Sequence, residues 1–201
     1  MKKITKYIPT IILTLLCSCS DYLDIVPDNV TTLDIVFNNR NTAERYLANC
    51  YHFVPDHGSV KRIPGMGAGH ECWFYTTNDS HFDNEVSFYI ARGLQNIDAP
   101  YANYWDGEGG SNLPMFRAIR ECNIFLDYVR DQHKVNDLTD SERKRWIAEV
   151  NVLKAYYHFF LFEHYGPIPI VDKALPVSTD PEGVKVTRMP VDQIVDYMVK
   201  L

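Results

Sequence analysis

The sequence predicts an all-α fold, and three observations predict it. Apolar residues recur at helical spacing in four segments, near residues 41–54, 113–132, 139–165 and 190–201. Helix-capping and helix-stopping residues lie at several of their ends. The only extended run that stands out, residues 168–171, is four residues long and has Pro167 and Pro169 beside or within it. With 46% hydrophobic and 23% charged residues, the chain has an ordinary globular composition.

The N-terminus has the pattern of an export signal. Lys2, Lys3 and Lys6 precede an apolar stretch over residues 8–16, which is too short to cross a bilayer, since a spanning helix needs about 20 apolar residues. The sequence Leu16-Cys17-Ser18-Cys19 follows and matches the bacterial lipobox, with Ser18 as the small residue before the cysteine. We therefore predict a lipoprotein signal peptide over residues 1–18 and lipidation of Cys19. A secreted protein with an ordinary cleavage site is the alternative.

Residues 19–40 are predicted to form the lipidated N-terminus and a tether, with acidic residues and Pro27 between short apolar runs. A helical domain is predicted over residues 41–201. Its first helix is expected to begin near Asn41, where Asn41 and Glu44 have the spacing of a capping box, and to end at Pro55.

Residues 56–112 differ from the rest of the chain. They contain eight of the ten glycines, many aromatic residues and several Asn and Asp residues, with no sustained period. A segment of this length without regular structure is usually functional or ordered by short helices. We therefore predict irregular loops that carry the function.

The next two helices are the clearest. Residues 113–132 carry apolar positions at spacings of three and four. Thr139 and Glu142 predict a capping box for the following helix, which Gly166 and Pro167 should end. Its predicted core-facing stripe consists of Trp146, Val150, Leu153, Tyr157, Phe160, Leu161 and His164. His158 and His164 are six residues apart, which places them on different faces of the helix, so both are predicted to pack structurally rather than to bind a metal.

A last helix is predicted from Pro190, with an apolar face of Val191, Ile194, Val195, Met198 and Val199. Because the pattern runs to Leu201 with no partner after it, we expect the helical domain to be incomplete.

Charge and cysteine content limit the function. The formal charge of −6 becomes −9 when the three lysines of the leader are removed. Nucleic acid is therefore not expected as a partner, because phosphate binding depends on Lys and Arg. Cys50, Cys72 and Cys122 would remain in the mature protein, which allows at most one disulfide and one free thiol. Burial as small hydrophobic side chains is the expected role for at least two of them.

The stretch from Glu149 to Val171 resembles the signature E-A-x-x-L-R-A-x-x-Y-F-x-L-x-x-x-Y-G-x-V-P-L-V of the SusD/RagB family, outer-membrane lipoproteins of Bacteroidetes that capture nutrients. Asn151 and Lys154 depart from the pattern. Further similarities, in the order that the family has them, are residues 19–27, Asn103-Tyr104-Trp105, residues 119–126 and Arg188-Met189-Pro190.

This resemblance implies tetratricopeptide-like helix pairs with irregular loop insertions. It also implies a non-enzymatic protein on the outer membrane, anchored by lipid and exposed at the surface, that binds oligosaccharides or peptides and covers a TonB-dependent, SusC-like transporter. Family members run to several hundred residues, so the resemblance too implies that this chain is truncated.

The aromatic and amide residues of the loop region suit sugar binding, because sugar rings present apolar faces to aromatic planes and hydroxyl groups to amides and carboxylates. The candidate ligand-binding residues are Trp73, Tyr75, Asn78, Asp79 and Tyr101. Packing of the loops onto the helices is the alternative reading for each aromatic, and Trp105 in particular is expected to pack.

Other chemistry finds little support in the sequence. The cysteine and histidine spacings do not match a zinc site, and the glycines at 65, 67 and 69 follow no predicted strand, so no metal and no cofactor are expected. Two alternative functions remain open: an assembly partner of the transporter without its own ligand, and a surface-anchored hydrolase, for which no catalytic set stands out.

Overall fold

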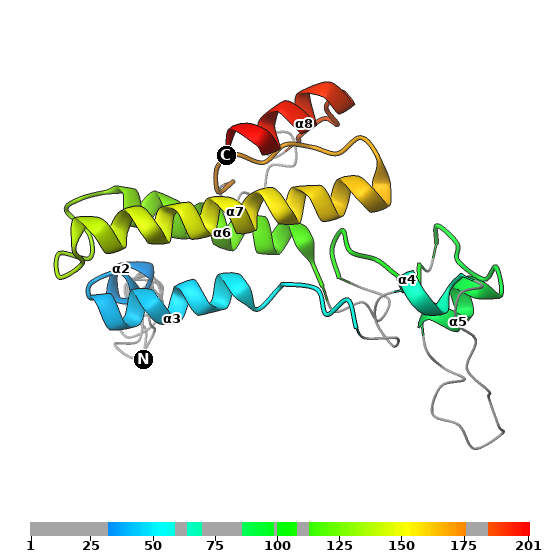
Figure 1. The fold of residues 1–201 in the computed structure, drawn as a ribbon, viewed down its shortest axis with the longest axis horizontal. Coiled ribbons are helices and arrows are strands. Elements are labelled where there is room, and N and C mark those ends of the chain that lie inside the picture. Colours follow the sequence, from blue (N-terminus) through cyan, green and yellow to red (C-terminus); the bar gives the residue numbers. More distant parts are fainter. Residues whose placement is uncertain (1–31, 59–63, 70–85, 99, 108–112, 176–184) are drawn as a thin grey trace, which may run out of the picture. The chain divides into compact units, whose positions relative to one another are not determined.

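The computed structural model describes residues 32–58, 64–69, 86–98, 100–107, 113–175 and 185–201. The chain forms two compact units, residues 1–35 and 36–201. The short helix α2 (Leu33–Val36) begins in the first unit. The second contains α3 (Arg40–Tyr51), α4 (Pro64–Gly67), α5 (Val86–Ala91), α6 (Met115–Arg130), α7 (Asp140–Tyr165) and α8 (Val191–Lys200) (Figure 1). Helices are the only regular elements within these ranges, so the predicted all-α class is confirmed.

Helix α3 begins two residues earlier than the sequence predicts. Asn39, in an extended conformation, is the N-cap, and its side-chain oxygen accepts a hydrogen bond from the Thr42 amide at 3.1 Å. The prediction that Asn41 caps this helix is therefore wrong. Both positions hold asparagine, which suits a cap, but Asn41 lies within the helix, and the extended Asn39 can reach forward to the Thr42 amide in the first turn. The helix ends at Tyr51, before the predicted stop at Pro55.

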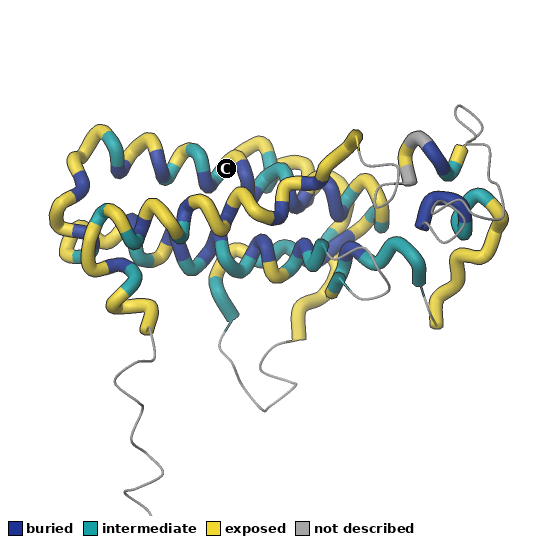
Figure 2. Tube along the Cα trace, turned by 90° about the horizontal axis from the view of Figure 1, so that it is seen from below, coloured by how far each residue is buried: buried dark blue, intermediate teal, exposed yellow. Residues whose placement is uncertain are grey.

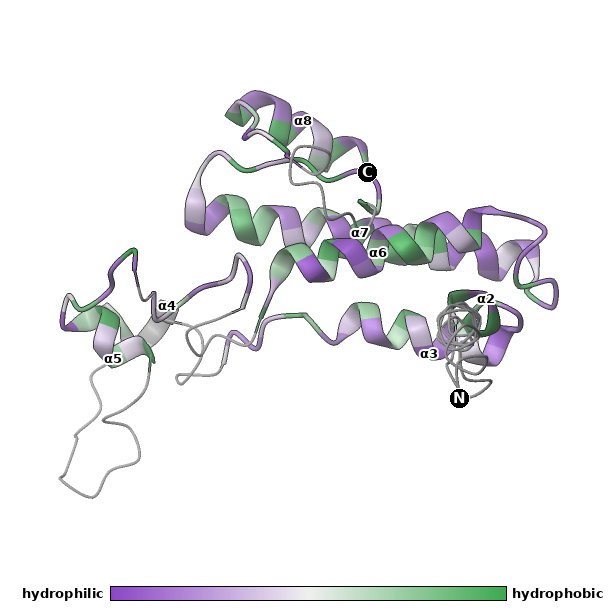
Figure 3. Ribbon diagram, turned by 180° about the vertical axis from the view of Figure 1, so that it is seen from behind, coloured by the Kyte–Doolittle hydropathy of each residue, from purple (hydrophilic) through white to green (hydrophobic). Residues whose placement is uncertain are grey.

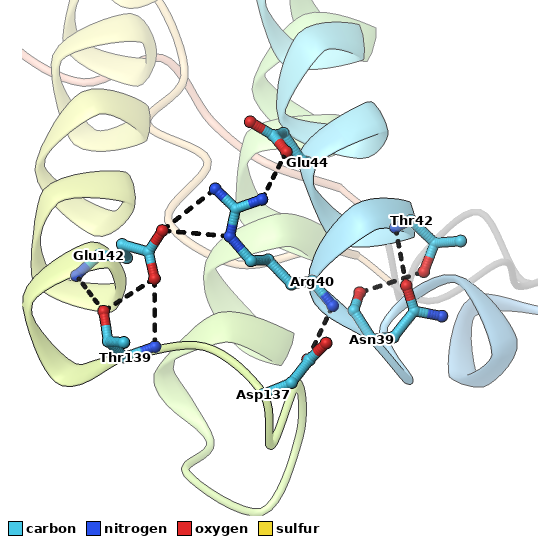
Figure 4. A network of polar contacts seen from close by, with 7 residues as sticks. All are labelled: Asn39, Arg40, Thr42, Glu44, Asp137, Thr139 and Glu142. Carbon is cyan, nitrogen blue, oxygen red and sulfur yellow. Dashed lines mark hydrogen bonds and ion pairs between the residues drawn. The ribbon is translucent and has the colours of Figure 1, made fainter.

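A polar network joins the start of α3 to the start of α7 (Figure 4). The Arg40 guanidinium contacts Glu44 at 3.0 Å and Glu142 at 3.1 Å, while the Arg40 amide donates to Asp137 at 2.8 Å. Hydrogen bonds from Thr139 and Arg40 lower the pKa of Glu142. Because the charged groups are partly exposed, the network adds little to the stability of the fold. Its main effect is to fix the start of α3 relative to the start of α7.

Helices α6 and α7 form the centre of the second unit and pack along their lengths, with α3 against both and α8 against α7 (Figures 1 and 2). The predicted period of residues 113–132 becomes α6, whose buried face includes Met115, Ile119, Phe125 and Leu126. Figure 3 shows the same alternation of apolar and polar positions around the helices. None of the described helices is long and apolar enough to cross a membrane.

Helix α7 matches its prediction closely. Thr139 and Glu142 form the expected capping box, and Gly166, at φ 68°, ends the helix with its amide bonded to the Phe162 carbonyl. The positive φ explains the glycine, because side chains disfavour that conformation. Every residue of the predicted stripe is buried except His164, which is exposed at the end of the helix. His158 is fully buried, as expected of a packing residue.

Replacing Thr139 by alanine should lower the free energy of unfolding by about 1 kcal/mol, because the first turn of α7 loses its side-chain cap. Urea unfolding followed by circular dichroism measures the change. Ser141→Ala, at an exposed position in the same turn, is the matched control and should have little effect. An unchanged midpoint in Thr139→Ala would mean that water replaces the cap without loss.

Helix α8 is held on α7 by apolar and polar contacts. Ile194 is fully buried, and the Tyr197 hydroxyl donates to Asp172 at 2.9 Å. The buried Lys154 ammonium also contacts Asp172 at 2.9 Å, so one carboxylate joins α7, α8 and the segment between them. The predicted apolar face of α8 is covered only in part, since its three valines, Val191, Val195 and Val199, are exposed.

Candidate functional site

Between α5 and α6, the described residues 94–98 and 100–107 are held together by their own polar side chains. The Gln95 side-chain oxygen accepts a hydrogen bond from the Tyr101 amide at 2.8 Å. Asn103 accepts one from the Trp105 amide at 3.1 Å and donates to the Asp106 carboxylate at 2.5 Å. An asparagine that bonds to the backbone two residues ahead forms a turn without help from a helix or a sheet. The turn that Asn103 forms contains Trp105, which is half-buried, and Asp106, which is exposed.

Glycine is required where this segment reaches α6. Gly107 has a φ of 86°, and a Cβ atom there would lie 2.8 Å from Cδ of Pro114. Pro114 is the residue before α6, and the amide of Met115 donates to the Tyr104 carbonyl at 2.9 Å. Tyr104 itself is fully buried. The turn is thereby fixed to the beginning of α6.

Trp105 lies at the centre of an aromatic and cationic cluster. Its ring packs edge-on against Phe116 of α6, with centroids 4.7 Å apart, and against Tyr165 of α7, at 5.5 Å. The guanidinium of Arg188 lies 5.1 Å from the centroid of the indole, a cation–π contact, and donates to the Pro167 carbonyl at 3.1 Å. Trp105 is half-buried, so the predicted packing role is confirmed while part of the side chain stays accessible.

Tyr165, the last residue of α7, contacts both Trp105 and the backbone of the residue before it. Its hydroxyl accepts a hydrogen bond from the Tyr104 amide at 2.8 Å. Burial raises the pKa of Tyr165, so the phenol stays protonated in the physiological range and keeps a proton to donate.

These residues line a hollow of about 600 Å³, here called the Trp105 groove. Its lining residues are Gln95, Asn96, Ile97, Pro100, Ala102, Asn103, Trp105, Asp106, Tyr165 and Arg188. Trp105 also borders a smaller, mostly apolar hollow of about 280 Å³. The other residues that line this hollow are Phe116, Arg120, Pro169, Val171, Leu175 and Val186.

The Trp105 groove combines the two kinds of surface that a sugar needs. Trp105 and Tyr165 offer aromatic rings for the apolar faces of a pyranose, and the side-chain amides, the Asp106 carboxylate and the Arg188 guanidinium offer partners for hydroxyl groups. A few polar groups around an apolar centre are typical of small-molecule sites. Among the described residues, no group of three or more His, Cys, Asp or Glu side chains is arranged to hold a metal ion.

Only one of the five predicted ligand-binding residues, Tyr101, is among the residues that the structure describes. Trp73, Tyr75, Asn78 and Asp79 lie outside the described residues, as does Cys19. Tyr101 is described, and its ring stacks on Tyr89, with centroids 4.4 Å apart and an interplanar angle of 12°. It belongs to the segment that forms the groove, although it is not one of the lining residues.

Several groove residues were not among the predicted ones, in particular Asp106, Tyr165 and Arg188. Tyr165 and Arg188 lie 60 and more residues from Trp105 along the chain, so no local pattern connects them. A signal was nevertheless present, because both belong to stretches that carry the resemblance to the SusD/RagB family.

Comparison with known families gives a match over nearly the whole chain. A family model for SusD-like proteins, described as "Starch-binding associating with outer membrane", matches residues 21–200. No curated protein sequence is significantly similar to this chain.

Solved structures show the same fold. A laminarin-binding SusD-like protein is similar with a TM-score of 0.58 and 16% identity, over 82% of this chain and 33% of that protein. A SusD-like protein from Bacteroides fragilis is similar with a TM-score of 0.59 and 18% identity, over 83% of this chain and 29% of the other. This chain therefore spans about a third of the length of these relatives.

Proposed function

Since the chain belongs to the SusD-like family of starch-binding proteins that associate with the outer membrane, we propose that it binds a glycan in the Trp105 groove and passes it to a TonB-dependent, SusC-like transporter. The ligand is an oligosaccharide or, as a second possibility within the same role, a peptide. The protein binds without turnover. A lipid on Cys19 anchors it to the outer membrane, with residues 19–40 as the tether.

The observation that carries this proposal is the position of Trp105. Its indole is half-buried between α6, α7 and Arg188, and it borders a groove whose rim carries amide, carboxylate and guanidinium groups. An aromatic ring that is held rigidly loses little entropy when a sugar stacks on it. The surrounding polar groups match the hydroxyls of the sugar, which fixes the orientation of the ligand.

The loop residues Trp73, Tyr75, Asn78 and Asp79 form a second part of the proposal, together with Tyr101. In this proposal they supply further aromatic planes and hydroxyl partners for the glycan, and their substitution to alanine tests them separately. Unchanged calorimetric titrations in all five variants would remove them from the binding surface.

Replacing Trp105 by alanine should weaken glycan binding by several-fold to more than tenfold. An aromatic contact is worth about 0.5–1.5 kcal/mol beyond the area it buries, and 1.4 kcal/mol is a factor of ten. Isothermal titration calorimetry with oligosaccharides of starch and of laminarin measures the change. The chain is exported with its own leader and purified in detergent.

A second variant keeps this test informative if Trp105→Ala disturbs packing. Arg188→Gln removes an exposed charge at the groove and should also weaken binding, with the far-ultraviolet circular dichroism unchanged. Arg145→Gln is the matched control, because Arg145 is an exposed arginine twenty residues before Tyr165 on α7, about 30 Å away along the helix. Equal affinity in all three variants would exclude the Trp105 groove as the binding site.

Two other functions predict different results. An assembly partner of the transporter would co-purify with a large β-barrel protein and give no heat with any glycan. A surface-anchored hydrolase would shorten the oligosaccharide on prolonged incubation, which chromatography of the sugar detects. Saturable binding with intact sugar is the outcome that we expect.

A further inference from the structure

Two cysteines lie on facing helices in the core of the second unit. Cys50 is in the last turn of α3, and Cys122 is in the middle of α6. Both side chains are fully buried and belong to the same hydrophobic cluster, and both are thiols in the structure. Burial of at least two cysteines was predicted from the sequence, which does not indicate which of them lie together.

The residues beside the two cysteines show that these positions face each other. The Tyr46 hydroxyl donates to the Glu121 carboxylate at 2.5 Å, and the Asn49 amide donates to the same carboxylate at 3.4 Å. Tyr46 lies one helical turn before Cys50 and therefore on the same side of α3. Glu121 directly precedes Cys122. Cys122 is also near enough to the Cys50 thiol to raise its pKa.

Facing positions on two packed helices have the separation that a disulfide spans. Helix axes about 8–10 Å apart, with Cα atoms about 2.3 Å from each axis, bring facing Cα atoms to roughly 3.4–5.4 Å. Disulfides join Cα atoms about 4.4–6.8 Å apart and sulfur atoms about 2.0 Å apart. Cysteines at facing positions of α3 and α6 are therefore within reach of a disulfide.

We infer that Cys50 and Cys122 form a disulfide that joins α3 to α6 in the exported protein. The inference rests on the outer-membrane location in the proposed function, because disulfides persist in the oxidising cell envelope and are rare in the cytosol. It does not depend on glycan binding. The bond adds a covalent link to a pair of helices that already pack together.

The reaction is an exchange with a dithiol oxidase of the envelope, an enzyme whose active site contains a disulfide. One cysteine thiolate attacks that disulfide, forming a mixed disulfide and releasing one sulfur of the oxidase. The second cysteine thiolate then displaces the other sulfur of the oxidase. The new S–S bond forms, two protons leave the cysteine thiols, and the oxidase takes up two electrons and departs as a dithiol.

The exchange belongs to folding and not to the finished protein. The neighbouring Cys122 thiol, together with burial, raises the pKa of the Cys50 thiol in the native structure. Because only a thiolate attacks a disulfide, native Cys50 is unreactive, and no oxidase reaches a fully buried sulfur. The two sulfurs are therefore joined during folding, while they are still accessible to the oxidase.

Peptide mapping tests the pairing directly. Trypsin should leave Cys50 in the peptide of residues 46–61, Cys122 in residues 121–130 and Cys72 in residues 63–92. The chain is exported by a Gram-negative host with its own leader, and free thiols are blocked with N-ethylmaleimide in denaturant before digestion. We expect a linked pair of the peptides 46–61 and 121–130, which disappears on reduction, and a blocked Cys72.

Recovery of both peptides in the blocked, unlinked form would overturn the inference, and so would a linked pair that contains residues 63–92. Glycan titration of the same preparation separates this result from the proposed function, since binding could persist without the bond.

A stability measurement adds a second readout. Reduction should lower the melting temperature of the wild-type chain by roughly 5–15 °C. The same reductant should leave the melting temperature of Cys50→Ala/Cys122→Ala unchanged, while Cys72→Ala should respond like the wild type. A wild-type melting temperature that does not respond to reduction would contradict the bond.

Discussion

Replacing Arg143 by alanine should lower the free energy of unfolding by about 3–5 kcal/mol. Arg143, in the first turn of α7, is buried, and its guanidinium donates to four backbone carbonyls. These belong to Val129 at 2.6 Å, Asp131 at 3.1 Å, Lys134 at 3.0 Å and Val135 at 3.0 Å. The last carbonyls of a helix have no partner within the helix, so Arg143 satisfies the end of α6 and folds the connection to α7.

The alanine variant removes the guanidinium donor from the buried Val129 carbonyl, which costs about 1–3 kcal/mol, and it also loses the three other hydrogen bonds of Arg143. The carbonyls of Asp131 and Val135 still accept hydrogen bonds from the amides of Lys134 and Leu138, which limits the total loss. Arg143→Lys should recover less than half of the loss, because an ammonium cannot reproduce the fork of a guanidinium. Urea unfolding at neutral pH gives the free energies. Arg145→Ala is the matched control: it lies two residues away, pairs with Glu149 at 3.6 Å on the surface and should change the value by less than about 0.5 kcal/mol. Equal losses in Arg143→Ala and Arg145→Ala would refute the bridging role.

The second large effect is a loss of stability in weak acid that depends on His158. Burial lowers the pKa of His158 to about 4, although a hydrogen bond to the Lys154 carbonyl at 2.8 Å opposes the shift. The charged groups that face the ring are the Lys154 ammonium and the Asp172 carboxylate, and the ring of Tyr197 lies 5.1 Å away. His158 is therefore neutral in the folded protein at neutral pH.

The sign of the effect follows from this depressed pKa. The unfolded chain binds a proton at His158 as the pH falls through about 6.5, whereas the folded chain does so only near pH 4. The free energy of unfolding therefore falls over this interval, by about 2 kcal/mol between pH 8 and pH 5. Below that window the lowered pKa of Asp172 adds a further loss as this carboxylate is protonated.

His158→Gln should remove most of the decrease between pH 8 and pH 5, as measured by urea unfolding at both values. His133→Gln, which changes an exposed histidine, should retain the wild-type decrease. If the wild-type and His158→Gln proteins lost stability in parallel, another group would be responsible.

The helices of this chain were predictable because their signals are local. In α7, Thr139, Glu142 and Gly166 mark the two ends, and the spacing of Trp146, Val150 and Tyr157 marks the buried side, all within one stretch of sequence. The predicted cap of α3 was wrong because positions 39 and 41 are both asparagine, so residue type does not distinguish them. The backbone conformation that decides between them depends on contacts with residues 137–142, nearly a hundred positions away.

The candidate site was predictable only in part. The resemblance gave the family, which the match over residues 21–200 confirms, and Asn103 and Trp105 were recognised as parts of a motif. The groove itself joins residues near 95–106 with Tyr165 and Arg188, and it depends on how α6, α7 and the segment before α8 pack. The proposed roles of Trp73, Tyr75, Asn78 and Asp79 still await their experimental test.

Local sequence patterns were sufficient to predict the helical class, the extents of α6 and α7 and the capping box at Thr139, and the resemblance predicted the family. Helical periodicity and capping depend on residues a few positions apart, so they can be read without a structure. The packing of the helices was needed to show that Cys50 and Cys122 share one buried cluster, that Arg143 bonds to the end of α6 and that Trp105 shares a groove with Arg188. Such pairs lie far apart along the chain or across a turn, and which of them meet is fixed only when whole helix faces pack together.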